Sequence, residues 1–162
     1  MSSPHKILFV CLGNICRSPV AEGVFIHRAR ERGVLDRFLV DSAGTGDWHA
    51  GERPDRRSIA VAAKHGVELP GVARQVTTAD FVAFDRIVAM DLENHAGLVV
   101  RGAPRTKVEL LLAYHPDPAS LPRGLEVPDP YYGGPEGFDA MFAMIDAACR
   151  GLLDAALSER GR

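Results

Sequence analysis

The chain has few cysteines, no long hydrophobic run and no marked excess of charge. Its three cysteines among 162 residues, Cys11, Cys16 and Cys149, are an odd number, which argues against a disulfide framework and is typical of a reducing cytosol. The early apolar run at residues 7–12 is far shorter than a signal-peptide core or a membrane span. We therefore expect a cytoplasmic protein, with secretion by a route that needs no signal peptide left open.

The charges are nearly balanced, with 19 Lys and Arg against 21 Asp and Glu, a formal net charge of −2. Such a balance gives no overall attraction to nucleic acid or to anionic membranes, so neither is expected as a partner. Any selectivity for anions must come from a local site. The length of 162 residues allows one core without disulfides or a structural metal, and we expect a single domain over residues 1–162.

Strand-like and helix-like segments alternate along the chain. Short apolar runs predict strands at residues 6–10, 38–41, 86–90 and 108–112. Helical spacing of apolar residues predicts a first helix that stops near Gly33, and helices at residues 54–65, directly after Asp91, and at 136–158. This alternation favours a parallel sheet with helices on both faces.

Several single residues set the expected helix starts and loops. Ser18 followed by Pro19 is typical of an N-cap and a first helical position, and Asp91 is placed to cap the helix after the third strand. Residues 42–53 are expected to form a glycine-punctuated loop. Six prolines between residues 113 and 135 exclude a regular helix or central strand there. A loop of that length inside a domain is more often functional than accidental.

The loop Cys11–Arg17, here called the first loop, joins the first strand to the first helix. Ligands of open α/β sheets bind beyond the carboxyl ends of strands, and a helix N-terminus favours anions. If the loop curls around a phosphate, its N–H groups point at the oxygens, Arg17 clamps two oxygens, and the Cys11 sulfur lies beneath the phosphorus. The positive surroundings favour a Cys11 thiolate, which is positioned for in-line attack.

Other residues of the first loop fit the same interpretation. Gly13 allows close backbone approach, Asn14 tolerates a left-handed conformation, and Ser18 can donate a hydrogen bond to the Cys11 sulfur. A plain alternative is that Cys11 is a buried strand-end cysteine, or a metal ligand together with Cys16. The strand–loop–helix context favours a phosphate cradle, because context is what confirms a short motif.

The proline-rich segment supplies a candidate general acid. Asp129 lies between Pro128 and Pro130, which would hold its backbone stiffly, and a nearby bound dianion would favour its protonated form. Tyr131 and Tyr132 could form apolar walls around an aromatic ring, as a phosphotyrosine side chain would need. The alternative is an exposed turn with ordinary tyrosines; the first loop makes the catalytic interpretation the stronger one.

Together, the sequences CLGNICRSP at residues 11–19 and DPYY at residues 129–132 resemble the nucleophile and acid loops of the low-molecular-weight protein tyrosine phosphatases. The resemblance covers essentially the whole chain, since length, element order and motif separation also agree. It implies a three-layer α/β fold with a doubly wound, four-stranded parallel sheet, and no metal or cofactor. It also implies phosphotyrosine-containing proteins as substrates, with inorganic phosphate or other oxyanions as product or inhibitor.

The resemblance also implies roles for particular residues. Cys11 would be the nucleophile and Arg17 the phosphate clamp, while Asp129 would protonate the tyrosyl oxygen and then activate water. Cys16 would be the second loop cysteine, which can form a disulfide with Cys11 under peroxide. Phosphate and substrate would be held by Leu12, Gly13, Asn14, Ile15, Cys16, Ser18, Trp48, Tyr131 and Tyr132. Asn14, Ser18 and Ser42 would form the hydrogen-bond network that holds the loop in shape, and Asp91 would support the loop or Arg17 from the end of the third strand.

One position departs from the family. Relatives often carry a histidine shortly before the stretch Ala73-Arg74-Gln75, where this chain has Pro70-Gly71-Val72. The departure bears on a supporting contact to the first loop. Trp48 has its own alternative, a partly buried packing residue, and Cys149 is expected to be a small buried hydrophobe within the last helix.

Three other functions can be weighed against the phosphatase. Arsenate reductases of the same fold need two further cysteines, whereas only Cys149 lies outside the first loop. A non-catalytic phosphotyrosine-binding module would need neither Cys11 nor Asp129. A nucleotide-binding domain would carry a glycine-rich phosphate loop with Lys-Ser or Lys-Thr, or a three-glycine fingerprint, after the first strand. The sequence therefore favours a phosphatase that works through a phospho-cysteine.

Overall fold

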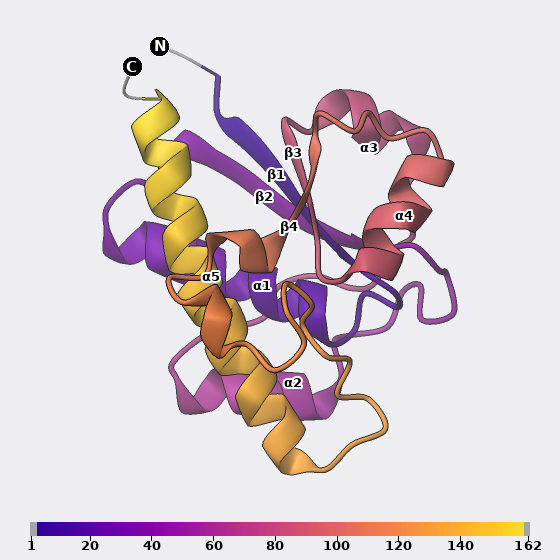
Figure 1. Cartoon of the computed structure of the whole chain (residues 1–162), viewed down its shortest axis with the longest axis vertical. Coiled ribbons are helices and arrows are strands. Elements are labelled where there is room, and N and C mark those ends of the chain that lie inside the picture. Colours follow the sequence, from indigo (N-terminus) through magenta and orange to yellow (C-terminus); the bar gives the residue numbers. More distant parts are fainter. Residues whose placement is uncertain (1–2, 161–162) are drawn as a thin grey trace.

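Four parallel strands form the centre of the molecule (Figure 1). The computed structural model describes residues 3–160. The strands are β1 (His5–Cys11), β2 (Phe38–Gly44), β3 (Arg86–Ala89) and β4 (Val108–Leu110), in the spatial order β2-β1-β3-β4. All three neighbouring pairs are parallel. The predicted four-stranded parallel sheet is thus confirmed.

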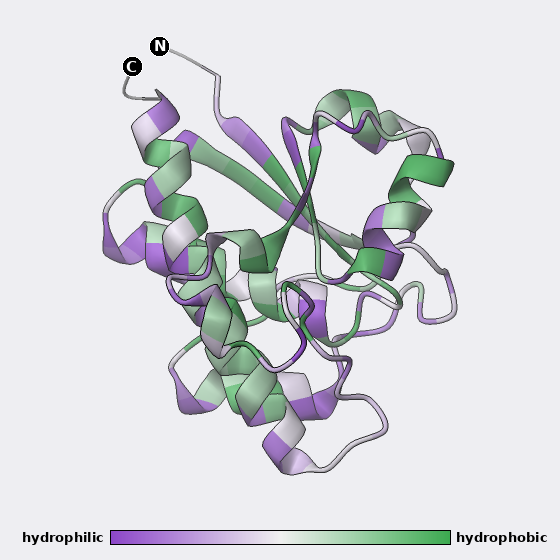
Figure 2. Ribbon diagram, in the orientation of Figure 1, coloured by the Kyte–Doolittle hydropathy of each residue, from purple (hydrophilic) through white to green (hydrophobic). Residues whose placement is uncertain are grey.

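The central strand β1 contributes side chains to two separate hydrophobic cores. Ile7, Phe9 and Cys11 belong to one core and Leu8 and Val10 to the other, as expected when successive side chains point to opposite faces of a sheet. A strand buried on both faces must be apolar, which explains the uninterrupted apolar run at residues 7–10. Figure 2 shows this apolar centre with hydrophilic residues on the outer helix faces.

Helices lie on both faces of the sheet, which gives the predicted three layers. On one side are α1 (Arg17–Glu31), α2 (Arg56–Lys64) and the long α5 (Pro135–Arg160). On the other are α3 (Thr78–Ala83) and α4 (Leu92–Val100), whose residues Phe81 and Leu98 belong to the second core. Short 3-10 turns, η1 (Leu35–Arg37), η2 (Leu111–Tyr114) and η3 (Pro118–Ser120), complete the chain.

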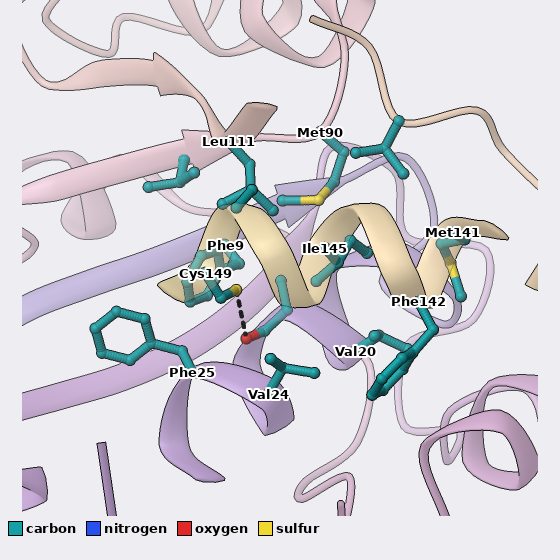
Figure 3. Packing of buried hydrophobic residues seen from close by; sticks show 14 of the residues in the cluster. Phe9, Val20, Val24, Phe25, Met90, Leu111, Met141, Phe142, Ile145 and Cys149 are labelled. Carbon is teal, nitrogen blue, oxygen red and sulfur yellow. Dashed lines mark hydrogen bonds between the residues drawn. The ribbon is translucent and has the colours of Figure 1, made fainter. Parts of the chain in front are cut away.

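Helix α5 packs against α1 and the sheet through a continuous apolar stripe (Figure 3). Met141, Ile145 and Cys149 recur at four-residue spacing along it, and each is buried. The Cys149 thiol donates to the carbonyl oxygen of Ala21, 3.6 Å from the sulfur. Cys149 is therefore the small buried core residue that the sequence predicts.

The ends of α1 differ in how well the sequence predicts them. Gly33 follows the helix with φ of 68°, and Gly33 and Val34 bond back to Arg30 and Ala29, so the predicted stop is confirmed. The prediction of Ser18 as N-cap is wrong: the helix begins at Arg17, with Cys16 as its cap and no capping side chain. The Ser18 hydroxyl is directed to the first loop instead.

Two strand predictions needed correction at their carboxyl ends. Strand β2 continues through Ser42 to Gly44, because these residues pair with β1 despite their small, polar character. Strand β4 ends at Leu110, and Leu111 and Leu112 form η2 instead. Both leucines enter the same core, which a continued strand could not achieve because it would point them to opposite faces.

Helix α3 was not predicted at all. Its start carries a capping box in which the Thr77 side chain accepts from the backbone of Asp80 and the Asp80 carboxylate accepts from the backbone of Thr77. That Thr-x-x-Asp pattern is a local helix-start signal visible in the sequence. The helix after β3, in contrast, starts as predicted, with the Asp91 carboxylate accepting from the Asn94 N–H at 2.7 Å. Within residues 3–160 no helix has the length and apolar character to cross a membrane.

Candidate active site

The first loop lies at the carboxyl edge of the sheet, between β1 and α1. Strands β1 and β3 are neighbours there, but the helices that follow them, α1 and α4, lie on opposite faces of the sheet. Such a switch point opens a crevice, which is the common ligand site of doubly wound folds. Cys11 ends β1 and Asp91 comes just after β3, so the two residues reach this crevice from adjacent strands.

The Cys11 side chain lies at the floor of this crevice, with 2% of the residue exposed. Its sulfur is 3.0 Å from the Ser18 hydroxyl oxygen and 3.5 Å from the Ser18 backbone nitrogen. Both groups are placed to donate a hydrogen bond to the sulfur. Ser18 occupies the first turn of α1, where backbone N–H groups have no partner within the helix.

The first loop is held in shape by the buried side chain of Asn14. This residue has φ of 57°, the one non-glycine residue among those described with a positive φ. Its Nδ2 donates to Ser18 and Ser42 hydroxyls at 2.8 and 3.0 Å, and its Oδ1 accepts from the Arg74 N–H at 3.0 Å. These three bonds fix a conformation that is otherwise uncommon for a residue with a side chain.

Gly44, at the end of β2, lets the first loop approach the sheet closely. A Cβ placed on this residue would lie 2.8 Å from the carbonyl oxygen of Leu12 and 3.2 Å from the Asn14 nitrogen. The backbone after Gly44 also bonds to the first loop. The Thr45 N–H donates to the Cys11 carbonyl oxygen, and the Gly46 N–H donates to the Leu12 carbonyl oxygen. A residue larger than glycine at position 44 would therefore push the loop out of place.

Arg17 is buried at the closing end of the first loop. Its Nη1 donates to the Asp91 carboxylate at 2.6 Å and to the Val127 carbonyl at 3.0 Å, while Nη2 lies 3.7 Å from an Asp129 oxygen. Burial works against the charged form, but the neighbouring Cys11 sulfur and Asp91 carboxylate outweigh it and raise the pKa of Arg17. The guanidinium thus keeps its charge although its side chain is buried.

Asp129, which belongs to the proline-rich segment, lies next to Arg17. The side chain is 42% exposed, and its Oδ1 accepts from the Tyr131 N–H at 3.1 Å, which forms a tight turn. Pro128 and Pro130 limit the backbone on either side. Asp129 therefore reaches the mouth of the site from a segment more than one hundred residues away from Cys11 along the chain.

Aromatic and apolar side chains surround a cavity of about 340 Å³ over the first loop. Tyr131 and Tyr132 lie edge to face, with ring centroids 4.8 Å apart, and Arg57 lies over the Tyr131 ring. Trp48 is 69% exposed, so it is not a buried packing residue. The cavity is lined by Cys11, Leu12, Gly13, Ile15, Cys16, Arg17, Trp48, His49, Asp129, Tyr131 and Tyr132.

The other two cysteines differ from Cys11 in their surroundings. Burial, reinforced by the Asp55 carboxylate and the Cys11 sulfur, raises the pKa of Cys16 to about 12, so Cys16 is a neutral thiol in this structure. Burial also raises the pKa of Cys149, which bonds to Ala21 on α1 and does not line the cavity. Cys149 is thus unsuited to the disulfide relay of an arsenate reductase.

The structure brings the sequence-predicted site residues together and adds others. Ser42 and Asp91, expected as supports, contact Asn14 and Arg17 respectively. Three further groups at the site are not predicted from the sequence: the Val127 carbonyl, the cavity residue His49, and Glu22. Of these, Glu22 carried a signal: a carboxylate four residues after Ser18 lies on the same face of a helix. No cluster of metal-ligating side chains occurs among residues 3–160.

Comparison with known proteins identifies the family. The family model described as low molecular weight phosphotyrosine protein phosphatase matches residues 6–162. This chain belongs to that family. The low molecular weight protein-tyrosine-phosphatase of Streptomyces coelicolor is 46% identical over 155 residues, 93% of each chain. As a low-molecular-weight phosphatase, the chain is a hydrolase that acts on phosphotyrosine, as the two loops predicted.

Solved structures share the fold of this low-molecular-weight phosphatase. YfkJ of Bacillus subtilis superposes with a TM-score of 0.90 at 37% identity, over 98% of each chain. A protein tyrosine phosphatase of Entamoeba histolytica, with Hepes in its active site, superposes with a TM-score of 0.89 at 35% identity. That match covers 96% of this chain and 99% of the Entamoeba protein. The doubly wound fold predicted from the resemblance is therefore confirmed.

Proposed function

We propose that the phosphatase works by a two-step route through a phospho-cysteine. The Cys11 thiolate attacks phosphorus, and the bond to the tyrosyl oxygen breaks as that oxygen takes the proton of Asp129. Asp129 then removes a proton from water, which attacks the phospho-cysteine and releases phosphate and the Cys11 thiolate. The observation that carries this proposal is the position of the Cys11 sulfur, on the floor of the cavity and within 3.5 Å of two hydrogen-bond donors.

Arg17 is the proposed clamp for the phosphoryl oxygens. Because Asp91 and Val127 hold Nη1, the guanidinium plane is fixed. Nη2, whose nearest carboxylate is that of Asp129 at 3.7 Å, is left to donate to a bound phosphate. A planar fork that is already fixed loses little entropy when it binds. Asp129, 3.7 Å from Nη2 and in the lining of the cavity, is placed to pass a proton to the departing oxygen.

The first-loop residues Leu12, Gly13, Asn14, Ile15, Cys16 and Ser18 supply the backbone that would surround the phosphate. Trp48, Tyr131 and Tyr132 supply flat apolar walls at the mouth of the cavity. A phenyl ring fits between such walls, whereas a short phosphoserine side chain would not reach them. We therefore take phosphotyrosine-containing proteins as the substrates and inorganic phosphate as product and inhibitor.

We also propose that the chain works as one cytoplasmic domain over residues 1–162. Both cores share the single sheet, so no boundary divides the described residues. The three cysteines are unpaired and buried, as suits a reducing compartment. Activity depends on a free thiol at position 11, which an oxidising compartment would threaten.

Replacement of Cys11 by serine tests this route. The hydroxyl is a far weaker nucleophile at neutral pH, so we expect turnover of para-nitrophenyl phosphate to fall by at least about 10⁴-fold. The cradle remains, so the variant should still bind inorganic phosphate, measured by calorimetry. A Cys149→Ser variant, outside the site, should keep its rate. Substantial turnover by Cys11→Ser would rule out the covalent route.

A further inference from the structure

Glu22 is a buried carboxyl group that the proposed chemistry does not use. It lies on α1, one turn after Ser18, and 7% of the residue is exposed. Its Oε1 accepts from the Ser42 hydroxyl at 2.6 Å. A buried carboxyl group destabilises the folded state unless it is well paired. The question is therefore what the Glu22 carboxyl group does at this position on the helix.

A continuous set of hydrogen bonds connects Glu22 to the nucleophile. Ser42 donates to Glu22 and accepts from Asn14 at 3.0 Å; Asn14 also donates to Ser18 at 2.8 Å; and the Ser18 hydroxyl lies 3.0 Å from the Cys11 sulfur. Four bonds thus link the carboxyl group to the sulfur. All five side chains are buried, so water competes little for these bonds.

The donor and acceptor of each hydrogen bond in this set follow from the groups at the two ends of the set. Since the Glu22 oxygen takes the Ser42 proton, Ser42 can offer only lone pairs to Asn14. The Asn14 amide must then present its nitrogen to both serines, while its oxygen accepts from the Arg74 N–H. Ser18 accepts from Asn14, so its own proton is left for the Cys11 sulfur at 3.0 Å or, at a longer 3.5 Å, for the Ala43 carbonyl oxygen. A Cys11 thiolate can only accept, so it would take the Ser18 proton.

We propose that Glu22 is a positioning residue for the phosphatase reaction, and that it holds Asn14 in its left-handed conformation through the Ser42 hydroxyl. The first loop is thereby kept in the shape of a phosphate cradle before substrate arrives. The inference rests on the proposed assignment of Cys11 as nucleophile. This positioning role accounts for the presence of a carboxyl group at a buried position behind the loop.

The charges around Glu22 come from the neighbouring strand and loop. Burial and the Asp41 carboxylate raise the pKa of Glu22 to about 7, against the lowering effects of the Ser42 hydroxyl and the Arg74 guanidinium. Asp41 and Arg74 form an ion pair, as do Arg74 and Asp80. A neutral carboxyl keeps an acceptor oxygen for Ser42, so the positioning role holds on both sides of this pKa.

Two substitutions of Glu22 distinguish the effect of its acceptor oxygen from the effect of its side-chain volume. Glu22→Gln keeps a carbonyl oxygen for Ser42, whereas Glu22→Met fills a similar volume without a comparable acceptor. Inhibition by inorganic phosphate, kcat for para-nitrophenyl phosphate, and the pH dependence of Cys11 alkylation by iodoacetate are measured for both. Glu31→Met, an exposed change on the same helix, is the matched control.

We expect Glu22→Met to weaken phosphate inhibition and lower kcat, each by about 10-fold, and to shift Cys11 alkylation to higher pH. Glu22→Gln should stay within about 3-fold of the unmodified enzyme, because the acceptor persists. A folded Glu22→Met enzyme with normal phosphate inhibition and alkylation would overturn the inference. An equal loss in Gln and Met would also overturn it, since it would point to charge or packing rather than to the acceptor.

If Glu22→Met does not fold, the Ser42→Ala variant tests the inference instead. Glu22 reaches Asn14 only through the Ser42 hydroxyl in this set of bonds, so phosphate inhibition must weaken in Ser42→Ala. Normal inhibition in that variant would overturn the inference. Failure of the proposed chemistry is recognised separately, because turnover by Cys11→Ser would contradict the covalent route whatever the Glu22 variants do.

Discussion

Arg17 shows how a single buried charge can serve a transient ligand. Asp91 pairs with the guanidinium, and the Val127 carbonyl fixes its plane. A buried arginine without such partners would be strongly unfavourable. The same contacts orient the side chain before phosphate binds, so little reorganisation is left for the reaction itself. Asp129 is the more exposed partner, which suits the proton transfers proposed for it.

The acid role of Asp129 predicts a dependence on the leaving group. Asparagine cannot donate a proton to the departing oxygen, so kcat/KM of Asp129→Asn should fall by about 10²-fold or more for a phosphotyrosine peptide. The loss should be much smaller for para-nitrophenyl phosphate, whose leaving group needs little protonation. Parallel losses for both substrates, measured by steady-state kinetics, would argue against the acid assignment.

At the scale of elements, the carboxyl edge of β1 and the start of α1 build the site, and α5 supports them from behind. Gly151 on α5 lies against η2: a Cβ there would overlap the Tyr114 carbonyl oxygen. This close approach is a backbone contact, so neither side has a flexible group that could move aside. Helix α5 thus depends on a small residue where it crosses the turn after β4.

Replacement of Gly151 by alanine should therefore destabilise the fold by about 1–3 kcal/mol, although alanine favours helices. Gly137→Ala in the same helix is the matched control, because its added methyl group would meet Pro130 at an ordinary 3.6 Å. That control should be neutral or slightly stabilising. Urea unfolding followed by circular dichroism measures both. Equal stabilities of the two variants would contradict the packing described for η2.

The elements that the sequence predicts well are those whose signals are local. The apolar run of β1, the Asp91 cap and the Gly33 stop each depend on residues within one turn or strand. The extension of β2 to Gly44 depends on pairing with β1, and the turn after Leu110 depends on the core beneath α5. Such features are decided by tertiary contacts, which single-sequence patterns do not contain.

At the scale of the whole molecule, the fold gathers a site from segments far apart in the chain. The sequence predicts Cys11, Arg17 and Asp129 because their residue types match a known chemistry. It does not predict the Arg17 contact with the Val127 carbonyl or the position of Glu22 behind Ser42. Both depend on how the proline-rich segment and β2 fold back onto the first loop, and a backbone carbonyl has no signature in a sequence.

The central claim is that phosphate passes through a covalent bond to the Cys11 sulfur. The most direct test is to mix the Asp129→Asn enzyme with para-nitrophenyl phosphate, quench within milliseconds and map phosphate by mass spectrometry. Hydrolysis of the intermediate should be slow in this variant, so we expect close to one phosphate per enzyme, attached to Cys11. Phosphate on another residue, or turnover with no phosphoenzyme at any quench time, would contradict the account.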